Sequence, residues 1–115
     1  MIIQHGINDI IQGDGPELYR NLETIVGTLK SHGKKVILQS IPPFDFEKQP
    51  RIDLWESCNR HIRQVLAPKC DGFLDVATFL SVDGAGQTTK YGGHPNAEGC
   101  SVWAEHLLPV LRRVL

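Results

Sequence analysis

The alternation of three short apolar runs with longer amphipathic stretches constrains the fold of this chain more than any other feature. The runs cover residues 1–3, 36–38 and 72–76, and they consist largely of Ile, Val, Leu and Phe. Such short apolar runs are typical of parallel strands that are buried on both faces. Because strands that alternate with helices form a parallel sheet covered by helices, the sequence predicts an α/β fold with right-handed crossovers.

The stretches between the runs carry apolar residues at helical spacing, with recognisable residues at their ends. The first predicted helix begins near Pro16, which suits a first helical position, and ends near Gly33. The second ends before Pro68, and the last begins at Asn96, a good N-cap residue. Pro109 lies inside the last helix, and we expect it to kink the helix or to interrupt its hydrogen-bond ladder.

Length and composition limit residues 1–115 to one modest domain or part of one, and we expect a domain that is truncated at its N-terminus and lacks its first strands. Composition also excludes several classes of function. The formal net charge is −1 and there is no basic run, which argues against nucleic-acid binding. No apolar run approaches the roughly 20 residues of a membrane span. The three cysteines form no Cys-x-x-Cys pair, which argues against a disulfide framework or a zinc site. The odd number of cysteines and the lack of an N-terminal secretion signal in these residues together favour a cytoplasmic location.

Four large side chains on the predicted helices have expected environments. Trp55 and Trp103 are predicted to lie in the core. His61 and His106 are expected to face solvent, and no convergent set of metal ligands is visible. We therefore expect neither a metal ion nor a cofactor.

Ligands of open parallel sheets bind beyond the carboxyl ends of the strands, where the first polar candidates occur. Gly6 follows the first strand and permits a tight turn, after which the amide of Asn8 can point into a cleft. Such a neutral donor suits a developing oxyanion. The same Asn-Asp pair is also explained by a turn that satisfies its own backbone. His5 either lines this cleft or has a structural role.

The second candidate is His94, in the sequence Gly-Gly-His-Pro-Asn at residues 92–96. Pro95 favours an extended conformation for His94, and Asn96 then caps the following helix. An imidazole held there, with a pKa near operating pH, is the usual general base for a serine nucleophile. A loop histidine that is hydrogen-bonded to backbone explains the position equally well.

Together, Gly-x-Asn-Asp after a strand and His-Pro-Asn-Ala-Glu-Gly at the start of the final helix resemble the third and fifth sequence blocks of the SGNH (GDSL) serine hydrolases. The resemblance extends over essentially the whole chain and implies a flavodoxin-like, three-layer α/β/α fold. It also implies hydrolysis of acyl esters through an acyl-enzyme. By this resemblance, His94 is the general base and Asn8 is an oxyanion-hole donor, with His5, Gly6 and Tyr91 beside the substrate.

The chain departs from the family pattern in three ways. The Gly-Asp-Ser block that carries the nucleophile is absent, and so is the glycine block of the oxyanion hole. Tyr91 occupies the position, three residues before His94, where the family has Asp. A Ser–His dyad is therefore expected, since the spacing gives Asp83 no support as a replacement. None of Ser31, Ser40, Ser57, Ser81 and Ser101 lies in a nucleophile context. We expect the serine upstream of Met1.

In the family fold the first strand pairs with the strand that precedes Gly-x-Asn-Asp. The strand at residues 1–3 is therefore expected to have an open edge, which either pairs with an upstream part of the same domain or with another chain. The partners expected are a small-molecule or glycan acyl ester and, through this edge, a second copy of the chain.

Two other functions fit parts of the sequence. A domain of this type that has lost its Ser and Asp could bind an acyl or glycan ligand without turning it over. A flavodoxin-like anion or nucleotide binder could use Gly92 and Gly93 before the last helix as a phosphate loop. The absence of a Walker-type or Gly-x-Gly-x-x-Gly loop argues against the latter.

Overall fold

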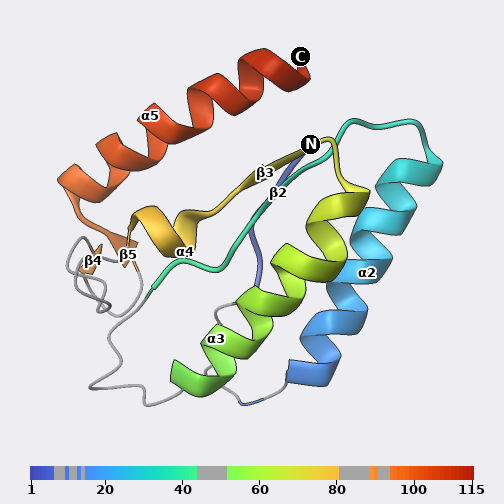
Figure 1. Cartoon of the computed structure of the whole chain (residues 1–115), viewed down its shortest axis with the longest axis horizontal. Coiled ribbons are helices and arrows are strands. Elements are labelled where there is room, and N and C mark those ends of the chain that lie inside the picture. Colours follow the sequence, from blue (N-terminus) through green and yellow to red (C-terminus); the bar gives the residue numbers. More distant parts are fainter. Residues whose placement is uncertain (7–9, 11–12, 14, 44–51, 81–88, 91–93) are drawn as a thin grey trace.

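A three-stranded parallel sheet forms the middle layer of the molecule (Figure 1). The computed structural model describes residues 1–6, 10, 13, 15–43, 52–80, 89–90 and 94–115. The strands are β1 (Ile2–Ile3), β2 (Ile37–Gln39) and β3 (Gly72–Leu74), and they lie side by side in that order. In the register, Ile37 lies between Ile2 and Gly72. The three strands follow the three apolar runs, which confirms the predicted parallel sheet.

Helices cover both faces of this sheet, which gives the predicted three-layer α/β/α arrangement (Figure 1). On one face lie α2 (Gly15–Ser31) and α3 (Ile52–His61), and on the other lies α5 (Ala97–Val114). A π-helical turn, η1 (Ile62–Leu66), and a 3-10 turn, η2 (Ala67–Lys69), extend α3. A short helix, α4 (Val76–Phe79), follows β3, and an antiparallel pair, β4 (Thr89–Lys90) and β5 (His94–Pro95), precedes α5.

Two apolar clusters lie on opposite sides of the sheet because successive strand residues point to opposite faces. Leu38 of β2 packs into the cluster beneath α2 and α3, with Leu22 and Ile62. Its neighbour Ile37 packs into the cluster beneath α5, with Val110. The two-sided burial of β2 explains why its sequence is continuously apolar rather than alternating.

The predicted helix boundaries agree closely with the structure at two positions, Gly33 and Asn96. Gly33 follows the end of α2 with φ +72°, a left-handed conformation that glycine adopts without strain. Asn96 is the N-cap of α5, and its side-chain oxygen accepts a hydrogen bond from the Gly99 N–H at 2.8 Å. Pro109 lies within α5, which continues past it to Val114. The proline still removes one backbone donor from the helix.

Two expectations about strand and side-chain environment were wrong, and a third, the core position of Trp103, held only in part. The third strand ends at Leu74 rather than at residue 76, and Val76 begins α4 although it is apolar and fully buried. His61 is half-buried and stacks on Tyr19, with 4.2 Å between ring centroids, whereas His106 is exposed as expected. The predicted core position is confirmed for Trp55, while Trp103 is only half-buried.

β1 lies at an edge of the described sheet, and its side chains are poorly covered. Met1 is 65% exposed and Ile2 is 46% exposed. Cys58, Cys70 and Cys100 all lie in the described part of the chain, and no disulfide joins them. Within that part, no helix combines the length and the apolar character needed to cross a membrane.

Candidate active site

The segment after β1 is shaped by close packing around Gly6. Its φ is +131°, which L side chains rarely adopt. A Cβ atom there would lie 2.8 Å from Ile41 Cδ1 and 3.0 Å from Leu18 Cδ1. The Gly6 carbonyl accepts a hydrogen bond from the Ile10 N–H at 3.0 Å. Glycine is therefore required for the chain to turn against α2 at the end of the strand, while the adjacent His5 is exposed.

Three of the residues considered for the catalytic chemistry, Asn8, Asp83 and Tyr91, lie outside the described residues. The predicted oxyanion donor and the residue at the family's Asp position therefore stay predictions from the sequence.

The backbone of His94 is held between a short strand pair and the start of a helix. His94 and Pro95 form β5, and His94 lies opposite Lys90 of β4. The next residue, Asn96, is extended and caps α5 through its side chain. This confirms the predicted extended conformation before the proline and the predicted helix cap. The backbone at His94 thus lies two residues before the N-cap of α5.

The described candidates all lie at the end of the sheet where the parallel strands finish. His5 and Gly6 follow β1, whereas β5 and α4 lie near the end of β3 (Figure 1). All three strands run in the same direction, so their carboxyl ends meet at this edge. In the strand order β1-β2-β3, His5 and Gly6 lie beyond β1 on one side of β2, and β5 and α4 lie beyond β3 on its other side. With about 4.8 Å between neighbouring strands, the backbones of β1 and β3 are about 10 Å apart.

A polar cluster that the sequence analysis missed joins the ends of β2 and β3. Ser40 is fully buried directly after β2, and its hydroxyl donates a hydrogen bond to Asp75 Oδ1 at 2.8 Å. The Ser40 oxygen in turn accepts a hydrogen bond from the Ala77 N–H at 2.8 Å. This serine is therefore engaged in the structure on both sides. It ties β2 to the start of α4 and is not exposed to a substrate.

Asp75 is the centre of this cluster. Its carboxylate accepts hydrogen bonds from Arg63 Nε at 2.9 Å and from Arg63 Nη2 at 3.1 Å, and one from the Thr78 hydroxyl at 2.8 Å. Burial acts to raise the pKa of Asp75, but the hydrogen bonds from Arg63, Thr78 and Ser40 hold it below the usual aspartate value. The ionised carboxylate thus links β3, α4 and η1.

The sequence did contain a signal for this cluster. Ser40 and Asp75 are each the first polar residue with a hydroxyl or carboxylate after a buried strand. Ser40 and Asp75 are 35 residues apart in the sequence, and they meet because of the register between β2 and β3. The sequence alone does not give this register, so it did not predict the pairing.

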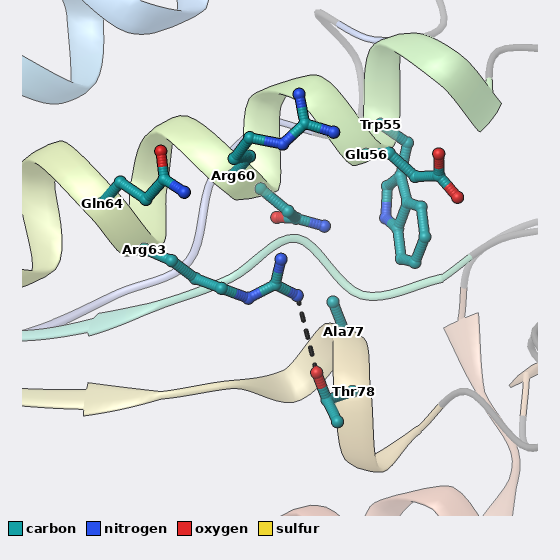
Figure 2. Close-up of a pocket in the computed structure, with 8 residues that line it drawn as sticks. Trp55, Glu56, Arg60, Arg63, Gln64, Ala77 and Thr78 are labelled. Atoms are coloured by element: carbon teal, nitrogen blue, oxygen red, sulfur yellow. Dashed lines mark hydrogen bonds between the residues drawn. The ribbon is translucent and has the colours of Figure 1, made fainter.

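A cavity of about 600 Å³ opens beside this cluster, between the helix formed by α3 and η1 on one side and α4 on the other. Arg63 and Thr78 face each other across it (Figure 2). Its described lining does not include His5, Gly6 or His94.

Comparison with known proteins identifies the sequence class. The sequence model of the GDSL-like lipase/acylhydrolase family matches residues 1–102 of the 115-residue chain. No curated protein sequence matches it.

Proposed function

The chain belongs to the GDSL-like lipase/acylhydrolase family, and from this membership we propose that it takes part in the hydrolysis of carboxylic acyl esters. The observation that carries the proposal is that His94 lies in β5, two residues before the N-cap of α5, near the carboxyl ends of the parallel strands. A general base must be held firmly beside the cleft where the ester lies. The substrate is a small-molecule or glycan acyl ester.

In the proposed reaction, the His94 imidazole removes the proton from a serine hydroxyl as the serine oxygen attacks the acyl carbonyl. The Asn8 amide donates a hydrogen bond to the resulting oxyanion. The tetrahedral intermediate then collapses to an acyl-enzyme and releases the alcohol, which takes the proton from His94. Water attacks the acyl-enzyme with His94 again acting as base, which releases the carboxylic acid and restores the serine.

The nucleophilic serine of this scheme is not one of the five in residues 1–115. None of them follows Gly-Asp as the family nucleophile does, and Ser40, the only one directly after a described strand, is buried in the Asp75 cluster. We propose that the serine is supplied from outside these residues. Tyr91 stands where the family has Asp, so the base works in a Ser–His dyad with His5, Gly6 and Tyr91 beside the acyl group.

A second function is supported by the same departures. Without Gly-Asp-Ser, and with Tyr91 in place of an acidic residue, the domain would bind an acyl or glycan ligand without cleaving it. Ester hydrolysis and ligand binding would use the same fold and the same cleft, and only the first would turn the ester over.

The test is hydrolysis of p-nitrophenyl acetate by a polypeptide that extends residues 1–115 upstream to include a Gly-Asp-Ser segment. We expect His94→Ala to lower kcat/KM by about two to four orders of magnitude, and Asn8→Ala to lower it by about two to three. His106→Ala is the matched control, because His106 is an exposed histidine on α5. Equal rates for the parent and His94→Ala would remove His94 from the mechanism, and absence of turnover in the extended parent would favour the binding module.

A further inference from the structure

The cavity beside α3 has one wall built from successive turns of a single helix. Glu56, Arg60, Arg63 and Gln64 share one face of α3 and η1, because residues three and four apart are neighbours on a helix. Figure 2 shows the side chain of Arg63 extending from this face towards α4, whereas the side chain of Arg60 lies along the helix at the rim of the cavity. Two guanidinium groups therefore border the same cavity.

The two arginines differ in how fully they are already used. Arg63 gives Nε and Nη2 to Asp75, so its charge is balanced, while its Nη1 makes no hydrogen bond to the described residues. Arg60 forms no ion pair or hydrogen bond within the described segments. A guanidinium carries five donors in a planar fork that matches a carboxylate with two parallel hydrogen bonds. Arg60 is thus available for an anion, with Arg63 as a second donor.

The remaining lining limits what this anion can be. Glu56 lies one turn before Arg60 on the same face and disfavours a ligand with more than one negative charge. The indole of Trp55 and the methyl group of Ala77 supply an apolar surface. The Trp55 ring is fixed because its N–H donates to the carbonyls of Ile41 and Pro42, at 3.0 and 3.1 Å. A flat apolar body can therefore lie against a rigid surface.

We propose that this cavity is a binding site for an organic monocarboxylate, with its carboxylate on Arg60 and the free donors of Arg63 and its apolar body against Trp55 and Ala77. The described lining contains none of the residues proposed to cleave an ester, and the proposal holds whether or not the domain is catalytic. It assigns a role to Arg60, which forms no ion pair or hydrogen bond within the described residues.

The experiment is an NMR titration of the chain with sodium benzoate, with sodium chloride at matched concentration as the blank. Benzoate should shift the backbone amides of residues 60–64 and 77–78 saturably, at millimolar concentration. Arg60→Gln should weaken binding about tenfold. Glu56→Gln should strengthen it about twofold, because a repelling charge is lost. Arg112→Gln, an exposed arginine on α5, should leave the affinity unchanged.

Several outcomes would overturn the proposal. They are the absence of saturable shifts at the cavity, unchanged benzoate affinity in Arg60→Gln, or weaker binding in Glu56→Gln. Two further ligands check the assigned chemistry. Tighter binding of inorganic phosphate than of benzoate would replace the monocarboxylate with a multiply charged anion. Equal binding of benzyl alcohol would show an apolar pocket with no role for the charge. Because Arg60 is exposed, its replacement should leave the fold intact.

Discussion

The two faces of the sheet are covered very differently. On one face, α2 and α3 with its extension η1 bury a large cluster in which Leu22 and Ile62 are almost completely shielded from solvent. On the other face α5 is joined only by the short helix α4 among the described residues, and only three residues of α5, Gly99, Val110 and Val114, are buried. The two-helix face therefore contributes most of the packing that holds the fold together.

On the face that α5 covers, side-chain burial differs most between β1 at the edge of the sheet and β2 in its centre. Ile2 lies in register with Ile37, so both side chains point to the face that α5 covers. Ile37 is 3% exposed, whereas Ile2 is 46% exposed. α5 packs on β3 and stops short of β1. The face that α5 covers is thus the less completely packed one.

The largest expected effect compares two leucines on helices of opposite faces. Leu22→Ala removes a side chain that is 1% exposed beneath α2, and it should lower the free energy of unfolding by about 3 kcal/mol. Leu107→Ala removes a half-buried side chain from α5 and should cost about 1 kcal/mol. Urea denaturation monitored by circular dichroism measures both. Equal losses for the two variants would contradict the division between the faces.

A smaller contrast concerns buried polar groups. Asn59 is 1% exposed, and its amide bonds the backbone N–H and C=O of Ile41 at 2.7 and 3.1 Å. Asn59→Ala should cost about 2 kcal/mol, because the Ile41 N–H loses its partner in the core. On the other face the Trp103 N–H donates to Gln39 at 2.6 Å near solvent. Trp103→Phe should cost about 1 kcal/mol. The same urea experiment checks both, and a larger loss for Trp103→Phe would reverse the comparison.

The elements themselves were predictable from the sequence, because each depends on a local pattern. The apolar runs around Ile37 and Phe73 and the capping Asn96 act within a few residues, and the structure follows them. The end of the third strand was not predictable in this way. Val76 continues the apolar run, yet Asp75 binds Arg63 and Ser40, and the chain turns into α4 at that point.

The site was predictable only where it depends on nearby residues. The extended conformation of His94 follows from Pro95 and Asn96 beside it. The cavity combines Arg60 with Thr78 of another element, and the Asp75 cluster combines three elements. Pairings of this kind depend on the register of the sheet and on how α3 sits against α4, which no short stretch of sequence specifies.

Measuring the free energy of unfolding as a function of pH distinguishes the contributions of Asp71 and Asp75, the two aspartates that flank β3. The pKa of Asp75 is lowered in the folded state, so its stabilisation is complete above the unfolded pKa and is lost as the pH falls through the folded value. We expect the free energy of unfolding to fall between about pH 5 and about pH 3, and Asp75→Asn to flatten this dependence. The pKa of Asp71 is also lowered, by the hydrogen bond from Lys30 and the Val36 N–H.

Asp71→Asn is the control for this titration, because Asp71 is exposed and its pair with Lys30 is screened by solvent. Its effect on the pH dependence should be the smaller one. A titration in which Asp71→Asn flattens the curve more than Asp75→Asn would show that the half-buried cluster contributes less than the exposed pair.

The smallest effect on stability is expected at the uncovered end of the sheet. Because Ile2 is exposed, Ile2→Lys should change the free energy of unfolding by less than about 0.5 kcal/mol.

We propose that the open edge of β1 associates with a second copy of the chain, since an exposed apolar edge strand is a template for pairing. Sedimentation velocity should then show concentration-dependent association of the parent and less association of Ile2→Lys, because a lysine on an edge strand opposes pairing. The exposed Leu108→Lys, on α5, is the matched control and should associate as the parent does. A parent that sediments as a folded monomer at all concentrations would exclude this edge as an interface and would leave the uncovered face as an open surface of the monomer.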